Sequence, residues 1–345
     1  MREKGREVSV VLEPLVFEVV TMGSATQDVF AKSDADTVTI KHHGESEKML
    51  AYPLGTKILI TDLEFQVGGG GTNAAASFAK QGLTTGYLGK VGTDGPGQEV
   101  QRFLKRNKIS FLGVVEGQTG YSVILDSQED DRTILTFKGC NNDLREAEIK
   151  DTLAALQTRW LYCSSMLGES ADTMQAVMRH VKERDGKVAF NPSSYQAAQG
   201  LGTLQRFLDH VDVLILNKEE AELLVGKQST EVRELSRVLA AAGPDIVIIT
   251  LGKGGVFLFD RQRYLHARPS KRLKIVETTG AGDAFGSGFV AGLAKGLSAE
   301  RALRLGMLNA ENVITAYGAK NNILTAAEME RALATDEREL NEEKL

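Results

Sequence analysis

The segment TTGAGDAF, residues 278–285, runs from a flexible turn straight into a long helical pattern rich in Gly and Ala. Gly280 and Gly282 permit a tight or left-handed backbone and leave no side chain in the way of a ligand. The amides that open the helix have no intrahelical acceptor, so they can bind an anion. Asp283 would repel that anion, and we therefore interpret it as a base that takes a proton from an attacking hydroxyl. The alternative is an N-capping Asp on a close-packed helix.

The composition is that of an ordinary soluble domain. The chain has 345 residues, enough for one large or two small domains, of which 42% are hydrophobic and 25% charged. A net charge of −5 without a basic block argues against nucleic acid or a membrane surface as partner. Cys140 and Cys163 lack metal-site spacing and predict a reducing compartment without disulfides. The first residues resemble neither a signal peptide nor a membrane span, so we expect a cytoplasmic protein.

Short apolar strands alternate with amphipathic helical segments along most of the chain. The predicted strands are 16–22, 85–91, 159–163, 187–190, 213–216 and 246–251. The predicted helices are 73–81, 97–107, 171–184 and 231–242. This alternation predicts an α/β fold with a mostly parallel central sheet covered on both faces. Ligands of such sheets bind beyond the carboxyl ends of the strands.

Two stretches break the alternation. Residues 37–67 contain short alternating runs without a helix, and residues 120–137 have the pattern of a hairpin. Antiparallel strands inserted in this way predict a small second sheet, which would serve as a lid or an interface. The alternative is that they extend the edge of the main sheet. We expect a single domain over residues 16–335, with tails at 1–15 and 336–345, the second of them highly charged and frayed.

A second glycine cluster, GGGGTN at residues 68–73, matches the G-x-G-x-x-A fingerprint of dinucleotide folds when it is read from Gly69 to Ala74. We reject that interpretation, because the fingerprint belongs in the first strand–helix turn with an acid about 20 residues further on. Here a strand and the antiparallel stretch come first. A Walker A motif is also absent, since no Gly-Lys pair is followed by Ser or Thr. Any phosphate must be bound without a P-loop lysine.

Polar groups in the last third of the chain predict a nucleotide-binding half. Asn217 and Glu220 lie on one helical face, and their oxygens suit Mg²⁺ directly or through water. The alternative is an N-cap Asn paired with a capping-box Glu. The loop from Thr250 to Gly255 lets the backbone approach a nucleotide; the alternative is a tight hairpin.

The first part of the chain supplies a different polar pair. Asp28 follows the first predicted strand, and Asn73 opens the helix after the four glycines. A carboxylate and an amide at strand ends suit the vicinal hydroxyls of a sugar. Each residue could instead be a helix cap.

Together these residues resemble the ribokinase-like, or PfkB, carbohydrate kinases. The resemblance covers about residues 16–334 and is carried by 68–97 and 278–285, with Asp28, the Asn217/Glu220 pair and Thr250 to Gly252 in the family's order. It implies a Rossmann-like three-layer α/β domain with a β-sheet lid. It also implies ATP-dependent phosphorylation of a sugar or nucleoside hydroxyl, with Mg²⁺ and, in some relatives, a monovalent cation such as K⁺.

The resemblance assigns roles position by position. Asp283 is implied as the catalytic base, kept ionised by the positive field of the helix start. The implied anion hole for the transferred phosphoryl group comprises Gly280, Ala281 and Gly282. The implied sugar contacts are Asp28, Gly69 and Asn73. The implied nucleotide-binding residues are Asn217, Thr250, Gly252 and Asn309, the last of them beside the adenine, and Glu220 is implied in placing Mg²⁺. We add Gly255, which closes the nucleotide loop.

Two positions depart from the family pattern. Glu277 stands where many relatives carry Asp beside the cation site, and Gly70 stands where several sugar and sugar-phosphate kinases carry Lys. Our first hypothesis is therefore a kinase that phosphorylates a primary hydroxyl of an unphosphorylated small sugar. The alternatives are a nucleoside or sugar-phosphate kinase of the same family and a non-catalytic sugar or nucleotide sensor. Exposed strand edges in the lid predict a homodimer.

Overall fold

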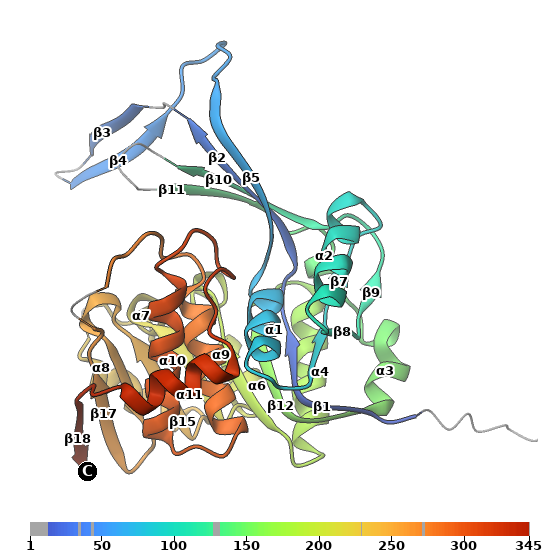
Figure 1. Cartoon of the computed structure of the whole chain (residues 1–345), viewed down its shortest axis with the longest axis vertical. Coiled ribbons are helices and arrows are strands. Elements are labelled where there is room, and N and C mark those ends of the chain that lie inside the picture. The colour runs from blue at the N-terminus through green and yellow to red at the C-terminus, as the bar shows by residue number, and fades with distance from the viewer. Residues whose placement is uncertain are drawn as a thin grey trace, which may run out of the picture.

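The computed structural model describes residues 13–33, 36–42, 45–126, 132–228, 230–270 and 273–344. Its larger sheet has the order β18-β17-β16-β15-β14-β13-β12-β1-β6-β8 (Figure 1). The strands from β8 to β15 are parallel, and β16, β17 and β18 continue the sheet in antiparallel fashion. The parallel strands are β1 (Leu15–Met22), β6 (Thr85–Leu88), β8 (Ser110–Phe111), β12 (Leu156–Ser164), β13 (Lys187–Asn191), β14 (Val213–Asn217) and β15 (Ile246–Thr250). The antiparallel strands are β16 (Val256–Phe259), β17 (Arg263–Ala267) and β18 (Leu340–Lys344).

Helices cover both faces of this sheet. Neighbouring residues of β1 point to opposite sides: Val20 belongs to one apolar core and Val19 to the other. The first core packs against α3 (Lys150–Ala155), α4 (Glu169–Lys182), α6 (Gly200–Leu208), α7 (Lys218–Val225) and α8 (Val232–Ala241). The second packs against α1 (Gly70–Lys80), α9 (Ala281–Ala294) and α10 (Ala299–Val313). Strands buried on both faces need continuous apolar runs, and for this reason the sequence pattern located them. The predicted three-layer α/β fold is confirmed.

Short elements complete the domain. They are β7 (Lys90–Val91), α2 (Gly95–Arg106), β9 (Val114–Val115), η1 (Gly139–Asn142), η2 (Glu146–Ile149), α5 (Ser194–Ala197), η3 (Gly252–Gly254) and α11 (Ala326–Thr335). None of the helices in the described part of the chain is long and apolar enough to cross a membrane.

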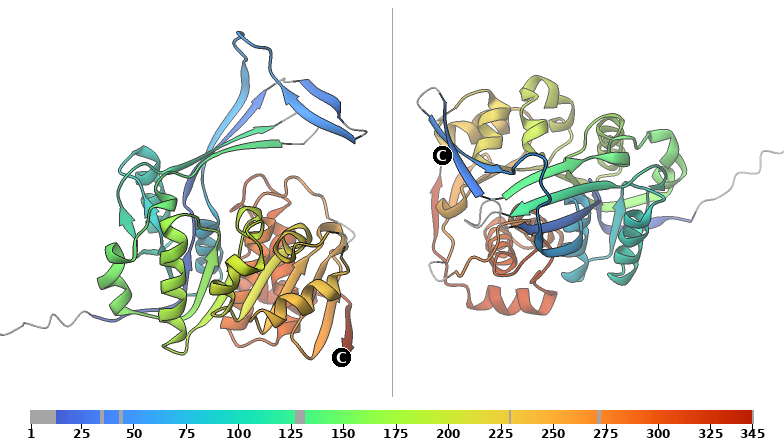
Figure 2. Two further views of the ribbon diagram at one scale, coloured as in Figure 1. Left: turned by 180° about the vertical axis from the view of Figure 1, so that it is seen from behind. Right: turned by 90° about the horizontal axis from the view of Figure 1, so that it is seen from above.

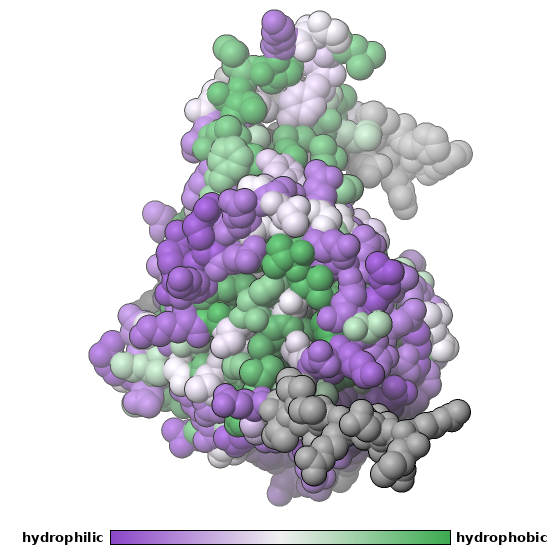
Figure 3. Space-filling model, turned by 90° about the vertical axis from the view of Figure 1, so that its right-hand side faces the viewer, coloured by the Kyte–Doolittle hydropathy of each residue, from purple (hydrophilic) through white to green (hydrophobic). Residues whose placement is uncertain are grey.

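A separate small sheet of order β11-β10-β2-β5 forms the lid. Its strands are β2 (Thr26–Ser33), β5 (Ile60–Gly68), β10 (Gly120–Asp126) and β11 (Arg132–Phe137), and the hairpin of β3 (Asp36–His42) and β4 (Glu45–Ala51) continues beyond them. Both views show the lid rising away from the main sheet and leaning over the half of the domain formed by C-terminal elements (Figures 1 and 2). The lid's outer strands carry exposed apolar side chains (Figure 3).

The lid begins earlier than the sequence pattern predicts. We expected its strands within 37–67 and 120–137, but β2 is a central lid strand that pairs with β10 and β5. Because both neighbours cover it, β2 is mostly buried and lacks the alternation that marks an exposed strand. Asp28, expected in a loop after the first strand, therefore lies within a strand.

The predicted frayed tail at 336–345 is wrong over its described residues. β18 pairs with β17 along its whole length, from Leu340 opposite Ala267 to Lys344 opposite Arg263. The chain before it is held by ion pairs: Arg338 contacts Glu311 at 2.8 Å, and Arg304 contacts Asp336 at 3.1 Å. High charge indicated a solvated tail, but these charges have partners far away in the sequence. The predicted tail at 1–15 lies mostly outside the described residues.

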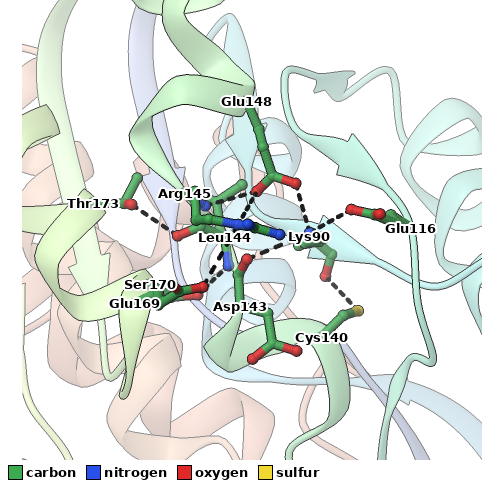
Figure 4. A network of polar contacts seen from close by, with 10 residues as sticks. All are labelled: Lys90, Glu116, Cys140, Asp143, Leu144, Arg145, Glu148, Glu169, Ser170 and Thr173. Atoms are coloured by element: carbon green, nitrogen blue, oxygen red, sulfur yellow. Dashed lines mark hydrogen bonds and ion pairs between the residues drawn. The ribbon is translucent and has the colours of Figure 1, made fainter.

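A buried lysine joins three segments on the lid side of the main sheet (Figure 4). Lys90, in β7, is 2% exposed and lies 2.7 Å from a carboxylate oxygen of Glu116 and 2.7 Å from one of Glu148. Burial alone would lower the pKa of Lys90, but the two carboxylates outweigh it and raise this pKa. Lys90 is therefore charged, and its removal would leave Glu148 without its cation.

We predict that Lys90→Met lowers the free energy of unfolding by about 2–3 kcal/mol, because a partly buried carboxylate loses its partner. The control is Arg145→Met, which removes a 59% exposed cation 3.9 Å from the same Glu148 and should cost less than about 1 kcal/mol. Urea unfolding followed by circular dichroism measures both. Equal losses in the two variants would contradict the assignment of Lys90 as the central group.

Candidate active site

The turn at the start of α9 has the geometry that its glycines predict. Gly280 is the N-cap, with φ of +77° in the left-handed region, and a Cβ there would collide with Ala319. The first intrahelical bond runs from the Ala284 amide to the Gly280 carbonyl at 2.8 Å. The Ala281 amide donates to the Thr278 carbonyl at 3.2 Å. This leaves the amides of Gly282 and Asp283 in the first turn without an intrahelical acceptor, at the positive end of the helix dipole.

Asp283 is not a helix cap. It lies in the first turn of α9, and its Oδ2 accepts a hydrogen bond from Nδ2 of Asn73 at 2.8 Å. Asn73 lies in α1, 210 positions earlier in the chain, and is only 7% exposed. Its Oδ1 is buried and has no hydrogen-bond partner among the described residues. A buried amide oxygen without a donor is costly, and beside a carboxylate it fits a ligand that carries a hydroxyl.

Glycines bring the start of α1 close to this pair. Gly69 caps α1 with φ of +94°, where a side chain would strike the Ser24 carbonyl, so its role in the site is to shape the backbone. A Cβ at Gly70 would lie 3.4 Å from Oδ1 of Asp283 and 2.8 Å from Oγ of Ser164. Ser164 ends β12, and its buried Oγ also has no partner in the described part of the chain. No sequence motif indicated a role for Ser164, because an isolated Ser at a strand end is common.

Asp28 completes the acceptor side. It lies in β2 with its carboxylate against Gly68, at the end of β5, where a Cβ would overlap it. Its Oδ1 accepts a hydrogen bond from Oγ1 of Thr26 at 2.7 Å. The structure thus brings together Asp28, Gly69 and Asn73, the three predicted sugar contacts, near Asp283.

Lys320 also interacts with Asp28 and Asp283, and the sequence analysis did not identify it as a site residue. Its Nζ donates to the Val67 carbonyl, and its charge interacts with the carboxylates of Asp28 and Asp283. Burial lowers the pKa of Lys320 to about 8, although both carboxylates raise it. Lys320 lies in an irregular segment after α10, and no sequence motif there indicates a function for a lysine.

Several opposing effects act on the pKa of the Asp283 carboxyl group. Burial raises its pKa, and the nearby Asp28 raises it further, while the hydrogen bond from Asn73 and the ammonium of Lys320 lower it. The positive field of the helix start, which favours the ionised form, is thus opposed by the loss of water around the carboxylate. A raised pKa makes the carboxylate a stronger base.

The nucleotide-side residues lie at the ends of neighbouring strands. Asn217 ends β14 directly opposite Thr250 at the end of β15. Asn217 caps α7: its Oδ1 accepts from the Glu220 amide at 2.8 Å, and a Glu220 oxygen accepts from the Asn217 amide at 3.0 Å. The capping-box alternative is thus present, and it holds the Glu220 carboxylate in place. Burial raises the pKa of Glu220, against hydrogen bonds from Asn217 and Ser194, and the charge of Asp283 also raises it.

The loop after β15 is a tight turn, as the hairpin alternative predicts. Gly252 opens the short helix η3, the Leu251 amide donates to the Gly255 carbonyl at 2.8 Å, and Thr250 pairs with Val256 across the hairpin. The hairpin nevertheless keeps Thr250 opposite the capped Asn217, with Gly252 and Gly255 in the turn that follows it. A role in nucleotide binding for these residues stays a prediction.

The predicted adenine contact of Asn309 is wrong. Asn309 is fully buried in α10, where Nδ2 donates to the Ala284 carbonyl at 2.8 Å and to Oγ of Ser77 at 3.1 Å. Its Oδ1 accepts from the Leu324 amide at 3.1 Å. The side chain therefore joins α10 to α1 and α9. From sequence, an Asn on a late helix cannot be distinguished from a ligand contact.

We predict that Asn309→Leu lowers the free energy of unfolding by about 2–3 kcal/mol, since three buried polar groups lose their partner, and leaves the KM for ATP unchanged. Asn312→Leu, in the same helix but half-buried, is the control and should cost less. Thermal unfolding and ATP titrations of activity measure these effects. A raised KM for ATP with unchanged stability would restore the adenine role.

Comparison with known proteins identifies the family to which this fold belongs. Residues 34–326 match the model of the pfkB family of carbohydrate kinases. An uncharacterized sugar kinase of Archaeoglobus fulgidus is 31% identical over 248 residues, covering 71% of this chain and 97% of the relative. The chain belongs to the pfkB family of carbohydrate kinases, which are phosphotransferases, and the resemblance inferred from the sequence is confirmed.

Other relatives differ in acceptor. A cytidine kinase of Thermococcus kodakarensis is 27% identical over 285 residues, covering 82% of this chain and 97% of the relative. A ribokinase of Lactococcus lactis is 28% identical over 285 residues, covering 81% and 89%. Among solved structures, Arabidopsis thaliana ribokinase complexed with ribose and ATP shares the fold with a TM-score of 0.77 at 20% identity, covering 93% of this chain and all of that one.

Proposed function

We propose that this sugar kinase transfers the γ-phosphoryl group of ATP to a primary hydroxyl of an unphosphorylated small sugar. The observation that carries the proposal is the Asn73–Asp283 pair. It offers a carboxylate that can take a proton, and beside it a buried amide oxygen that awaits a hydroxyl donor. Asp28 supplies a second acceptor for hydroxyls of the same molecule.

In the proposed reaction the acceptor hydroxyl gives its proton to Asp283, and its oxygen forms a bond to the γ-phosphorus. The bond from that phosphorus to the bridging oxygen breaks, and ADP leaves with the electron pair. The amides of Gly282 and Asp283 face the charge that builds on the phosphoryl oxygens, so most of the catalysis is positioning and charge neutralisation. The lid would exclude water, which otherwise competes as acceptor.

Mg²⁺ would be placed by Glu220 with Asn217 beside it. The described residues contain no group of three or more His, Cys, Asp or Glu that could hold a metal ion by itself. A single carboxylate suits Mg²⁺, which keeps several waters and takes its other ligands from substrate phosphates. When bound, the ion would neutralise phosphate charge.

A monovalent cation such as K⁺ has less support at Glu277. Its Oε2 accepts a hydrogen bond from the Gly318 amide at 2.7 Å, and its Oε1 accepts one from the Thr279 hydroxyl. The carboxylate thus already braces the turn before α9 against the segment that follows α10. We propose that this internal contact takes over part of the support that a cation gives in relatives.

The nucleoside alternative is supported by the cytidine kinase relative. We propose a coupled ADP-release assay with ATP and a panel of D-ribose, D-fructose, 5-dehydro-2-deoxy-D-gluconate, cytidine and adenosine. The sugar hypothesis expects turnover of a sugar and little of either nucleoside. The reverse ranking would favour a nucleoside kinase. Binding of ATP without ADP release from any acceptor would contradict the proposed reaction and favour a sensor.

Asp283→Asn should lower kcat by about 10²–10⁴-fold, because the amide cannot accept the proton. The fold and the thermal shift on adding ATP should persist. Asp151→Asn, at an exposed position of α3, is the matched control and should leave the rate unchanged. Turnover within a few-fold of the wild type in Asp283→Asn would remove the assignment of the base.

We also propose that the protein forms a homodimer through the lid. The outer lid strands expose Ile60, Leu63, Phe65, Ile134, Leu135 and Phe137, each between 48% and 59% exposed. Figure 3 shows apolar side chains gathered on this part of the surface. Apolar side chains exposed in this number favour association, and a second copy would cover part of them. The free, buried thiols of Cys140 and Cys163 suit a reducing compartment, so we place the reaction in the cytoplasm.

Light scattering at micromolar concentration should give the mass of a dimer. Phe65→Asp, which places a charge in the centre of the apolar surface, should weaken dimerisation by roughly tenfold or more. Leu223→Asp, on an exposed helix position away from the lid, should not change the mass. A monomeric wild type would exclude the proposed assembly.

A further inference from the structure

The segment 318–320 lies between the catalytic turn and the base of the lid. On one side, Ala319 packs so closely against Gly280 that a Cβ there would overlap it. On the other side, Gly318 packs against the side chain of Gln66, near the end of β5. Close contacts on both sides leave little room for movement, so the side chain of Lys320 starts from a defined place beside the acceptor site.

The ammonium of Lys320 is held at the junction of several elements. It donates to the carbonyl of Val67 in β5 and lies 5.3 Å from the centre of the Phe103 ring in α2. Residue 68, next in the chain, carries the backbone against which the Asp28 carboxylate packs. Lys320 thus stands among the groups that would surround the acceptor.

We infer that Lys320 is a positioning residue whose positive charge, held against the end of β5 near Asp28 and Asp283, keeps Asp283 ionised and ready to accept the acceptor's proton. Without it, two carboxylates would face each other in a site with little water, and protonation of one would relieve the repulsion. A protonated Asp283 cannot act as a base. The inference rests on the proposed function.

The surrounding groups agree with this assignment. Burial and the Asp28 carboxylate raise the pKa of Asp283, whereas the Asn73 amide and the Lys320 ammonium lower it. Lys320 carries its charge below pH about 8. The groups that face the two residues from neighbouring elements are Asn73 (α1), Asp28 (β2), the Val67 carbonyl (β5), Phe103 (α2), Tyr162 (β12) and Glu220 (α7).

The decisive variants separate the charge from the hydrogen bond. Lys320→Gln removes the charge but keeps a donor for the Val67 carbonyl, and Lys320→Arg keeps the charge. Lys105→Gln, on the exposed side of α2, is the control. We would measure kcat/KM from pH 5 to 9 with ATP and whichever of D-ribose, 5-dehydro-2-deoxy-D-gluconate or cytidine the wild type phosphorylates. Thermal unfolding and the shift on adding ATP check the fold.

For Lys320→Gln we expect the acidic limb of the profile to move to higher pH. Its rate at pH 6 should be lower by about tenfold or more, with a smaller loss near pH 8, where the wild-type lysine itself begins to lose its charge. Lys320→Arg should restore the wild-type limb. A loss that is equal at every pH, or shared by both variants, would assign Lys320 a merely structural role and overturn the inference.

Two outcomes distinguish failure of the inference from failure of the proposed function. A wild type that releases no ADP with any acceptor contradicts the proposed reaction itself. An active wild type whose acidic limb is unchanged in Lys320→Gln contradicts only the role of the lysine. If Lys320→Gln does not fold, Lys320→Arg decides: a wild-type acidic limb supports the inference, and a displaced limb contradicts it.

Discussion

The hydrogen bond between Asn73 and Asp283 is the interaction on which the site depends. It joins the first turns of α1 and α9, two helices that pack on the same face of the sheet and begin at the same edge of it. Glycine is required at 69, 70 and 280 because a side chain at these positions would collide with Ser24, Ser164 and Ala319, respectively. The pair thus sets the distance between the half of the site that would hold a sugar and the half that would hold a nucleotide.

Burial gives this pair its chemistry. Water is largely removed from Asp283, which raises its pKa and strengthens it as a base, but the same loss of water makes nearby charges more effective. Asp28, the proposed acceptor contact, therefore opposes ionisation of Asp283, and Lys320 offsets that effect. In the proposed reaction, binding of the hydroxyl and ionisation of the base would thus depend on the same small group of charges.

Most strands and helices of the main domain could be predicted from the sequence. Buried parallel strands require apolar runs and their helices require amphipathic ones, so elements such as β14 and α4 follow from local pattern. The failures lie where tertiary neighbours override that pattern. β2 is covered on both sides and lost its alternation, β18 is charged yet paired, and Asn309 resembles a ligand contact but satisfies three buried groups.

The sequence by itself determined the family, the α/β fold and the residue types at the catalytic turn, because glycines and an acid at a helix start obey rules that act within a few residues. Only the tertiary structure decided that Asp283 is held by Asn73 and is no helix cap, that the other amide oxygen of Asn73 is buried without a partner among the described residues, and that Lys320 binds the Val67 carbonyl beside them. Those features depend on contacts between segments more than two hundred residues apart and on the loss of water where they meet, neither of which leaves a mark on local sequence.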